Sequence, residues 1–314
     1  MPILFITSTH IGDGILSTGL LAHLMAEYPD HRFTIACGAP AAKVFAAAPR
    51  VDAIHVLRKR KHHLHWYDLW RATAFRRWDL IVDLRRTIMP WILWSRRAVS
   101  IPKSQGSMHR VELNGAALGI GPPDPVVWTT DAHRQEAEAI LGDDARPVVA
   151  LGPGATWIGK TWPAERFAEL AEWLTGPEGP APGARLLLTG GPDERAVAAP
   201  IFEAFPDADL IDGFGVDVLT TFELLRRCRI MVANDSAMMH LAAAAGIPTI
   251  GLFGPTREDR YAPWGTNSLV VRTPESADEL WQNPDLDHAN PGKMMLTLEV
   301  DRVVAGIRER WPQL

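Results

Sequence analysis

Cysteine is scarce in this chain, with Cys37 and Cys228 the only two among 314 residues. Two cysteines make no disulfide framework, so we expect a protein of a reducing cytosol. The sequence also lacks an uninterrupted apolar run of about 20 residues, which a membrane-spanning helix needs. Its apolar first residues carry no basic stretch and reach Asp13 early, unlike a secretory signal peptide. The expected location is therefore cytoplasmic, with any contact to the inner membrane being peripheral.

Sequence patterns of several common ligand sites are missing as well. The 11 histidines do not have the spacing of a zinc site, so no metal site is predicted. The 12 tryptophans are scattered without a pattern for stacking bases, which argues against nucleic acid as a partner. No helix is expected directly after the Gly-Lys-Thr at 159–161, so a P-loop is not predicted.

Charge is unevenly divided along the chain, although the net charge is only −5. Residues 1–110 contain 16 Lys and Arg against 7 Asp and Glu, whereas residues 111–314 contain 16 against 30. The resulting excess of +9 in the first part favours an anionic partner, and a well-solvated surface is the alternative. The basic stretch 58–65, which contains three histidines, has the same two interpretations.

Short apolar segments alternate with helical patterns along the whole chain. The apolar segments lack period-two alternation, which indicates strands buried on both faces of a parallel sheet. The first series comprises strands at 3–7, 32–37, 53–57, 80–84 and 98–101, and helices at 14–27, 39–47, 66–77 and 110–118. The second comprises strands at 148–151, 185–189, 209–211, 230–233, 249–253 and 269–271, and helices at 163–174, 193–205, 219–227, 236–245 and within 297–311.

The Gly- and Pro-rich segment 119–126 separates the two series and marks a domain boundary. We predict a Rossmann-like N-terminal domain at 1–125 and a Rossmann-like C-terminal domain at 126–314, with a final helix able to pack back onto the first. Two such domains, with ligand loops at the carboxyl ends of their strands, would leave a central cleft.

The first strand-to-helix loop with candidate chemistry is I-T-S-T-H-I-G-D-G at 6–14. Gly12 and Gly14 allow a tight turn and a close approach of the backbone to a ligand. Asp13, which we place in this loop, could act as a general base toward a substrate hydroxyl. The alternative is that Asp13 caps a helix that starts at Gly14.

The second loop, G-P-G-A-T-W-I-G-K-T-W-P at 152–163, contains Thr156 and Lys160. A lysine beside free backbone N–H groups suits a diphosphate. The alternative for Lys160 is a solvated loop charge.

The third loop, N-D-S at 234–236, comes before a helix that Gly246 ends. Ser236 lies near the N-cap, and His240 follows four residues later on the same helix face. Free N–H groups at this helix start favour a phosphate-bearing ligand. The alternatives are that Asp235 caps the helix and that His240 serves packing.

Together, the three motifs resemble glycosyltransferase family 9, the ADP-heptose:lipopolysaccharide heptosyltransferases and their relatives. The resemblance rests on I-G-D, P-G-A-x-W-x-x-K-x-W-P and N-D-S-x-x-M-H-L-A-A-A-x-G-x-P-x-I-x-L-F-G-P-T, in this order. It implies an α/β protein of the GT-B fold, in which two Rossmann-like domains with parallel sheets face a central cleft. It also implies that the C-terminal domain binds the nucleotide sugar and that the N-terminal domain receives the acceptor.

The resemblance assigns roles to individual residues. Asp13 matches the general base, and Lys160 matches a contact to the donor phosphates that supports catalysis. The implied donor-binding residues are Thr156, Lys160, Val216, Asp235, Ser236, Ala237 and His240. The expected acceptor-binding residues are His10, Lys59, Lys61 and Arg85.

The chain departs from the family pattern in three places. Ala237 stands where glycine is usual, and Gly19 stands where many members have proline. The segment 276–293 lacks the cysteines that some members contain.

The predicted function is an inverting, metal-independent glycosyl transfer that needs no cofactor. The expected substrates are a nucleotide diphosphate sugar, most simply ADP-heptose, and a lipopolysaccharide-core or related acidic glycan. The alternatives are a nucleotide-sugar epimerase of the GT-B fold and a non-catalytic protein that binds nucleotide sugars.

Overall fold

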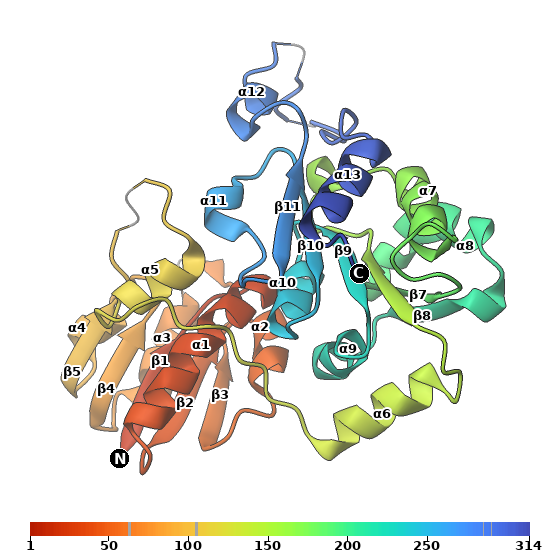
Figure 1. Ribbon diagram of the computed structural model, residues 1–314. Helices are drawn as coiled ribbons and strands as arrows, with labels where there is room; N and C mark the ends of the chain where they lie inside the picture. Colours follow the sequence, from red (N-terminus) through yellow and green to blue (C-terminus); the bar gives the residue numbers. More distant parts are fainter. Residues whose placement is uncertain (62–63, 104–105, 285, 290) are drawn as a thin grey trace. The chain divides into compact units, whose positions relative to one another are not determined.

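The computed structural model describes residues 1–61, 64–103, 106–284, 286–289 and 291–314. The chain divides into two compact units, Met1–Thr130 and Asp131–Leu314, each built on one parallel sheet (Figure 1). This arrangement confirms the predicted α/β class with two parallel sheets.

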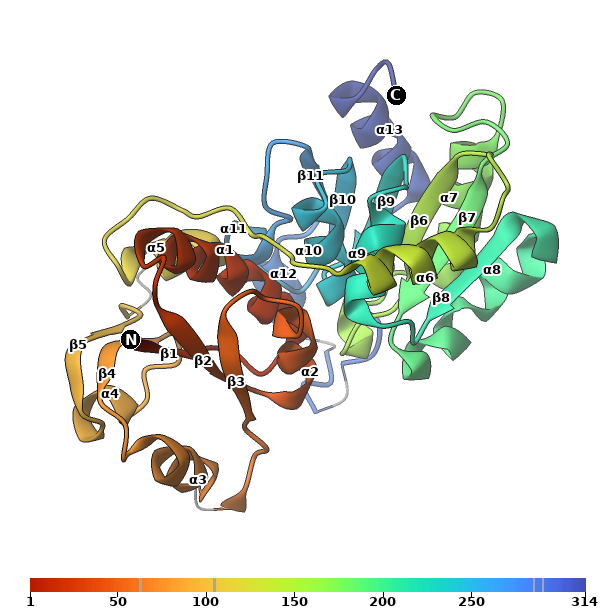
Figure 2. The same cartoon turned by 90° about the horizontal axis from the view of Figure 1, so that it is seen from below.

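The first unit has a five-stranded sheet with strand order β3-β2-β1-β4-β5. Its strands are β1 (Pro2–Ile6), β2 (Arg32–Cys37), β3 (Val51–Val56), β4 (Trp78–Asp83) and β5 (Ser95–Ser100). Its helices are α1 (Ile11–Glu27), α2 (Ala39–Ala42), the 3-10 helix η1 (Lys43–Phe45), α3 (Leu64–Thr73), α4 (Met89–Ile92) and α5 (Arg110–Ala116). Helices α1 and α5 lie on one face of this sheet, and α3 and α4 lie on the other (Figure 2). The strand order reverses between β1 and β4, so the loops after these two strands flank a ligand position typical of open α/β sheets.

The second unit has a six-stranded sheet with strand order β11-β10-β9-β6-β7-β8. Its strands are β6 (Val148–Gly152), β7 (Arg185–Gly190), β8 (Leu210–Phe214), β9 (Ile230–Asn234), β10 (Thr249–Phe253) and β11 (Ser268–Arg272). Its α-helices are α6 (Asp131–Leu141), α7 (Ala164–Thr175), α8 (Ala199–Ala204), α9 (Val218–Leu225), α10 (Ala237–Ala244), α11 (Glu258–Tyr261), α12 (Ala277–Trp281) and α13 (Val300–Arg310). Its 3-10 helices are η3 (Ile158–Lys160), η4 (Pro192–Ala198) and η5 (Asp207–Asp209). Here the strand order reverses between β6 and β9.

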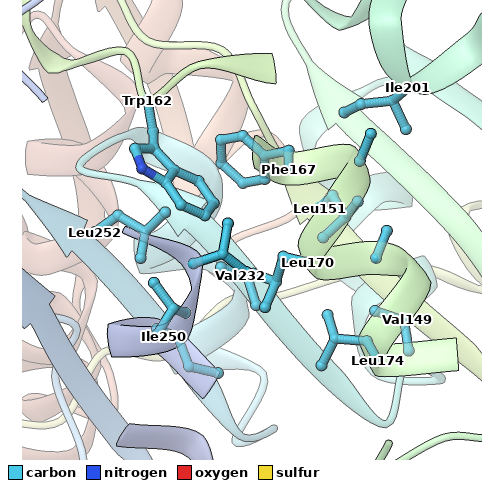
Figure 3. Close-up of a cluster of buried hydrophobic side chains, with 14 of the residues drawn as sticks. Val149, Leu151, Trp162, Phe167, Leu170, Leu174, Ile201, Val232, Ile250 and Leu252 are labelled. Carbon is cyan, nitrogen blue, oxygen red and sulfur yellow. The ribbon is translucent and has the colours of Figure 1, made fainter. Parts of the chain in front are cut away.

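The core of the second unit lies where α7 and α13 cover the central strands. Figure 3 shows Trp162 among side chains of β9, β10 and α7, and its ring meets that of Phe167 edge-on with 5.0 Å between centroids. Trp162 Nε1 donates a hydrogen bond of 2.7 Å to the carbonyl oxygen of Leu298, so the buried indole is satisfied. The end of the loop 152–163 is therefore fixed to the core. Val303 and Ile307 of α13 belong to the same core.

The predicted helices at 39–47 and 193–205 are each divided into two shorter ones. The first becomes α2 followed by η1, and the second becomes η4 followed by α8. Pro200 explains the second division, because it lies at the start of α8 and offers no N–H for the preceding turn. Helix α6 was not predicted, because its apolar face is narrow: only Ala137 and Leu141 are buried.

The segment between α5 and α6 runs as an extended chain across α1. Val126 N donates a hydrogen bond of 2.9 Å to Thr18 Oγ1. A Cβ atom at Gly19 would lie 2.3 Å from the carbonyl oxygens of Pro123 and Asp124. Gly19, which has no Cβ atom, thus lets the linker backbone reach the helix.

Within the described residues, no helix combines the length and the apolar character that crossing a membrane requires.

Both cysteines are free and buried. Burial raises the pKa of the Cys37 thiol to about 12 and also raises the pKa of the Cys228 thiol. Neither thiol is therefore suited to act as a nucleophile.

Candidate functional site

Asp13 lies in the first turn of α1, because this helix begins three residues earlier than predicted. Its N-cap is His10, so the expected placement of Asp13 in the loop is wrong, and Asp13 does not cap the helix. Ser8 Oγ donates a hydrogen bond of 3.0 Å to Asp13 Oδ2, which orients the carboxylate at the carboxyl end of β1.

Arg110, at the start of α5, is the second neighbour of this carboxylate. Its Nε atom lies 3.7 Å from Asp13 Oδ1, too far for a hydrogen bond but close enough for charge attraction. Asp13 Oδ1 is buried and receives no hydrogen bond within the described residues. That oxygen is therefore open to accept a hydrogen bond from a substrate hydroxyl.

Two of the predicted acceptor residues lie near the same sheet edge. Arg85 follows β4, donates a hydrogen bond of 3.0 Å to Thr9 Oγ1, and places its guanidinium 5.3 Å from the centre of the Trp66 ring. Thr9 immediately precedes His10, so the loops after β1 and β4 bring Arg85 close to the exposed N-cap of α1.

The predicted basic cluster is described only in part. Lys59 and Lys61 follow β3 and are exposed, whereas His62 and His63 lie outside the described residues. Arg60 forms an ion pair of 2.7 Å with Asp68 on α3. The alternative of a solvated loop thus fits Lys59 and Lys61 as well as an acceptor role does.

In the second unit, Lys160 and Asp235 form an ion pair across 75 residues of sequence. Lys160 Nζ donates a hydrogen bond of 2.7 Å to Asp235 Oδ2, and the two side chains are 22% and 5% exposed. The interpretation of Lys160 as a solvated loop charge is therefore wrong. Asp235 does not cap α10 through its side chain, since the N-cap is Ser236.

Asn234 holds the lysine-bearing loop against the end of β9. Its Oδ1 accepts a hydrogen bond of 3.1 Å from Trp162 N, and its Nδ2 donates one of 2.7 Å to the carbonyl oxygen of Pro153. The side chain is fully buried, so both bonds are shielded from water. Asn234 is therefore a positioning residue, a role that the N-D-S pattern by itself does not indicate.

The segment 154–161 reads G-A-T-W-I-G-K-T, which has the letter spacing of a P-loop. In the structure, Lys160 ends the short η3, Thr161 is extended, and α7 begins only at Ala164. The lysine therefore does not open a helix as it does in a P-loop, and its partner is a carboxylate.

The start of α10 offers hydrogen-bond donors beside the ion pair. Ser236 makes no side-chain cap, and its Oγ is buried without a hydrogen-bond partner within the described residues. Ala237 is the first helical residue, and His240 is buried one turn further along the helix. The free N–H groups, the hydroxyl and the Lys160 ammonium together suit an anion such as a phosphate.

The remaining predicted donor residues, Thr156 and Val216, lie in turns. Thr156 is exposed in the loop after β6, and Val216 is half-buried between β8 and α9, just after Gly215 with φ +77°. Thr156 is followed by Trp157, whose ring stacks on that of Trp281 with 5.4 Å between centroids and 7° between planes. The tryptophans are thus less scattered in space than in sequence, because α12 brings one of them onto this loop.

Two further features carry no signal in the sequence. Arg110 is one of them, because nothing in the sequence links α5 to the first loop. The other is Thr256 at the end of G-P-T: its Oγ1, like the Oγ of Ser236, is buried without a hydrogen-bond partner within the described part of the chain. As for metals, the residues described contain no group of three or more His, Cys, Asp or Glu that could hold an ion.

Comparison with known proteins shows that the chain is similar to heptosyltransferases. The sequence profile described as glycosyltransferase family 9 (heptosyltransferase) matches residues 87–288. The chain is 24% identical to lipopolysaccharide heptosyltransferase 2 of Salmonella typhimurium, over 87% of this chain and 88% of that protein.

Two solved structures have the same fold. The glycosyl transferase family 9 protein from Veillonella parvula gives a TM-score of 0.77 at 17% identity, covering 100% of this chain and 97% of the other. The ADP-heptose lipopolysaccharide heptosyltransferase II of Escherichia coli gives 0.76 at 18% identity, covering 100% and 99%. These likenesses confirm the predicted GT-B fold class.

Proposed function

The chain belongs to glycosyltransferase family 9, and we propose that it transfers heptose from ADP-heptose to an acidic lipopolysaccharide-core acceptor. The observation that carries this proposal is the Lys160–Asp235 ion pair beside the N-terminus of α10. It unites a cation, free N–H groups and a carboxylate, which are the groups that a sugar diphosphate requires. The donor and the acceptor class follow the names of the relatives, which are lipopolysaccharide heptosyltransferases.

The two residues of the ion pair suit different parts of the donor. A lysine ammonium has three N–H groups, and Asp235 accepts one of them, so two remain for phosphate oxygens. Asp235 would repel a phosphate and is better suited to accept hydrogen bonds from sugar hydroxyls. Lys160 thus faces the diphosphate and Asp235 faces the sugar.

The proposed reaction is a single displacement in which Asp13 is the base. Asp13 takes the proton of the acceptor hydroxyl while the oxygen of that hydroxyl attacks the anomeric carbon of the donor sugar. The bond from the anomeric carbon to the diphosphate oxygen breaks, and its electron pair leaves with ADP. One displacement inverts the anomeric configuration.

The charge of the leaving group is stabilised by the chain's own groups. Lys160 and the N–H groups at the start of α10 interact more strongly with the developing negative charge than with the intact donor. We therefore propose that the reaction proceeds without a metal ion or a cofactor. We also propose that it takes place in the cytoplasm.

The test is a transfer assay with the purified full chain, ADP-heptose and lipopolysaccharide-core acceptors of different length. We expect ADP release that depends on the acceptor, a heptosylated product by mass spectrometry, an inverted anomeric centre by NMR, and no loss of rate with EDTA. The family match favours transfer over the two alternatives. Conversion of ADP-heptose without any acceptor would point to an epimerase, and binding without turnover would point to a non-catalytic protein.

A further inference from the structure

Large aromatic side chains protrude from the first unit at the amino ends of β4 and β5. Phe75 is 94% exposed, Trp91 is 86% exposed and Trp94 is 65% exposed. Single exposed apolar residues are ordinary, but three large ones in one region of a small unit need an explanation.

Backbone and side-chain contacts join the segments that precede β4 and β5, and Phe75 and Trp91 lie close to these segments in the sequence. Trp78 N donates a hydrogen bond of 2.9 Å to the carbonyl oxygen of Trp94, which aligns the starts of β4 and β5. The Arg77 guanidinium lies 5.2 Å from the centre of the Trp94 ring. Phe75 is two residues before Arg77 in the turn from α3 to β4, and Trp91 lies on α4, three residues before Trp94.

The underlying elements are firmly held. Leu69 of α3 and Met89 of α4 belong to the same buried core over the sheet, together with Leu93. Figure 2 shows α3 and α4 on the same face of the sheet. The exposed aromatics therefore project from anchored elements, so their exposure is not the result of a frayed end.

Exposed arginines lie on the same segments of the chain as the aromatics. Arg71, Arg77 and Arg96 are all exposed, and of these only Arg96 has a carboxylate nearby within the described residues, 3.9 Å away at Asp79. Together with Phe75, Trp91 and Trp94 they form what we call the α4–β5 surface. It combines protruding aromatic rings with unneutralised positive charge.

We propose that the α4–β5 surface docks the protein on an anionic lipid bilayer. Tryptophan and phenylalanine partition into the boundary between headgroups and acyl chains, and arginine binds the anionic headgroups. Exposed arginines along the edge strand β5 disfavour pairing with a second copy of the chain. Phe75 and Trp91 are each more than four fifths exposed, and side chains that protrude this far suit insertion into a membrane better than a flat docking surface.

The proposal does not depend on the identity of the donor or acceptor, because lipid binding is measured without either. The probe is the full chain mixed with vesicles of phosphatidylcholine, with or without phosphatidylglycerol, and separated by sedimentation. We expect binding only when phosphatidylglycerol is present, with affinity decreasing as salt is added.

Variants locate the surface. Phe75→Ser/Trp91→Ser/Trp94→Ser should reduce vesicle binding roughly tenfold or more. Arg71→Ser/Arg77→Ser should reduce it by about fivefold for each charge removed. Leu296→Ser and Arg302→Ser are the matched controls, an exposed apolar residue and an exposed arginine of the second unit, and should bind as the unchanged chain does.

A spectroscopic measurement distinguishes loss of lipid binding from loss of folding. Lipids brominated in the acyl chains should quench part of the tryptophan fluorescence, and Trp91→Phe/Trp94→Phe should abolish that quenching while the melting temperature stays unchanged. The proposal is overturned if the chain ignores phosphatidylglycerol, if the serine variants bind vesicles as well as the controls do, or if the quenching survives. It is also overturned if these variants instead abolish self-association, or binding to RNA, in a chain that does not bind vesicles.

Discussion

Two carboxylates, Asp13 and Asp235, have opposite surroundings in this protein. Asp235 is buried and hydrogen-bonded to a lysine, whereas one oxygen of Asp13 receives no hydrogen bond within the described residues and lies 3.7 Å from Arg110 Nε. A base must have an oxygen that is free to take the proton, whereas a carboxylate that contacts the sugar must be held in a fixed position, as the Lys160 hydrogen bond holds Asp235. The difference supports the proposed roles, with Asp13 as the base and Asp235 as a sugar contact.

Asp13→Asn is expected to slow glycosyl transfer by roughly 10²–10⁴-fold, because the amide keeps the shape of the carboxylate but cannot take a proton. Donor affinity by calorimetry should stay nearly unchanged, since the donor is proposed to bind the second unit. Ser8→Ala is the companion variant: it removes the 3.0 Å hydrogen bond but leaves the base, so its loss should be much smaller. Full activity of the Asn variant would remove Asp13 from the mechanism.

Lys160→Ala is expected to weaken donor binding by roughly 1.5–3 kcal/mol, the usual contribution of a charge-assisted hydrogen bond. The same change leaves Asp235 buried without its partner, so thermal stability should also fall. Lys160→Met/Asp235→Asn separates the two effects, because it removes both charges. The double variant should regain stability without regaining donor affinity. Donor affinity unchanged in Lys160→Ala would contradict the phosphate role.

At the scale of elements, loops are held in place by contacts that span long stretches of sequence. Asn234 joins the end of β9 to the loop after β6, and the Trp157–Trp281 stack joins the same loop to α12. Trp281 Nε1 in turn donates a hydrogen bond of 2.9 Å to the carbonyl oxygen of Pro255, after β10. A loop fixed at several points keeps Lys160 oriented before the donor arrives. This lowers the entropic cost of ordering the loop when the donor binds.

The contact between α1 and the linker gives a stability prediction. Alanine for glycine inside a helix normally stabilises by about 1 kcal/mol. Gly19→Ala should instead destabilise by roughly 1–3 kcal/mol, because the added Cβ overlaps two linker carbonyl oxygens. Gly121→Ala is the control within the linker, where a Cβ meets no atom within 4 Å. Thermal unfolding measures both variants, and a Gly19→Ala protein as stable as the control would disprove the close packing.

At the scale of the whole molecule, the excess of basic residues in 1–110 should attract an acidic acceptor. We expect acceptor KM to rise with added salt, because surface charges are screened beyond about 8–10 Å at 0.1–0.15 M.

Lys59→Ser/Lys61→Ser should raise KM for the acceptor and reduce its salt dependence, while KM for the donor stays the same. Arg134→Ser/Arg302→Ser removes two exposed charges from the second unit and should leave both constants unchanged. An acceptor KM that is flat from low to high salt would mean that the basic stretch is only a solvated surface.

The sequence by itself determined the class of fold and the family. Apolar strands without alternation predicted parallel sheets, and β2 and β10 have the predicted bounds, because a strand buried on both faces leaves a continuous apolar run. The three motifs in order led to the family resemblance, because each lies on a loop whose residues are close in sequence.

Only the tertiary structure decided which residues from distant parts of each unit lie together. The Lys160–Asp235 pair, the position of Arg110 beside Asp13 and the Trp157–Trp281 stack each join residues separated by 75 or more positions. No local pattern records such contacts, since they arise when separate strands and helices pack. The start of α1 at Ile11 was also hidden, because glycines flanking Asp13 suggest a loop whereas packing against the sheet extends the helix.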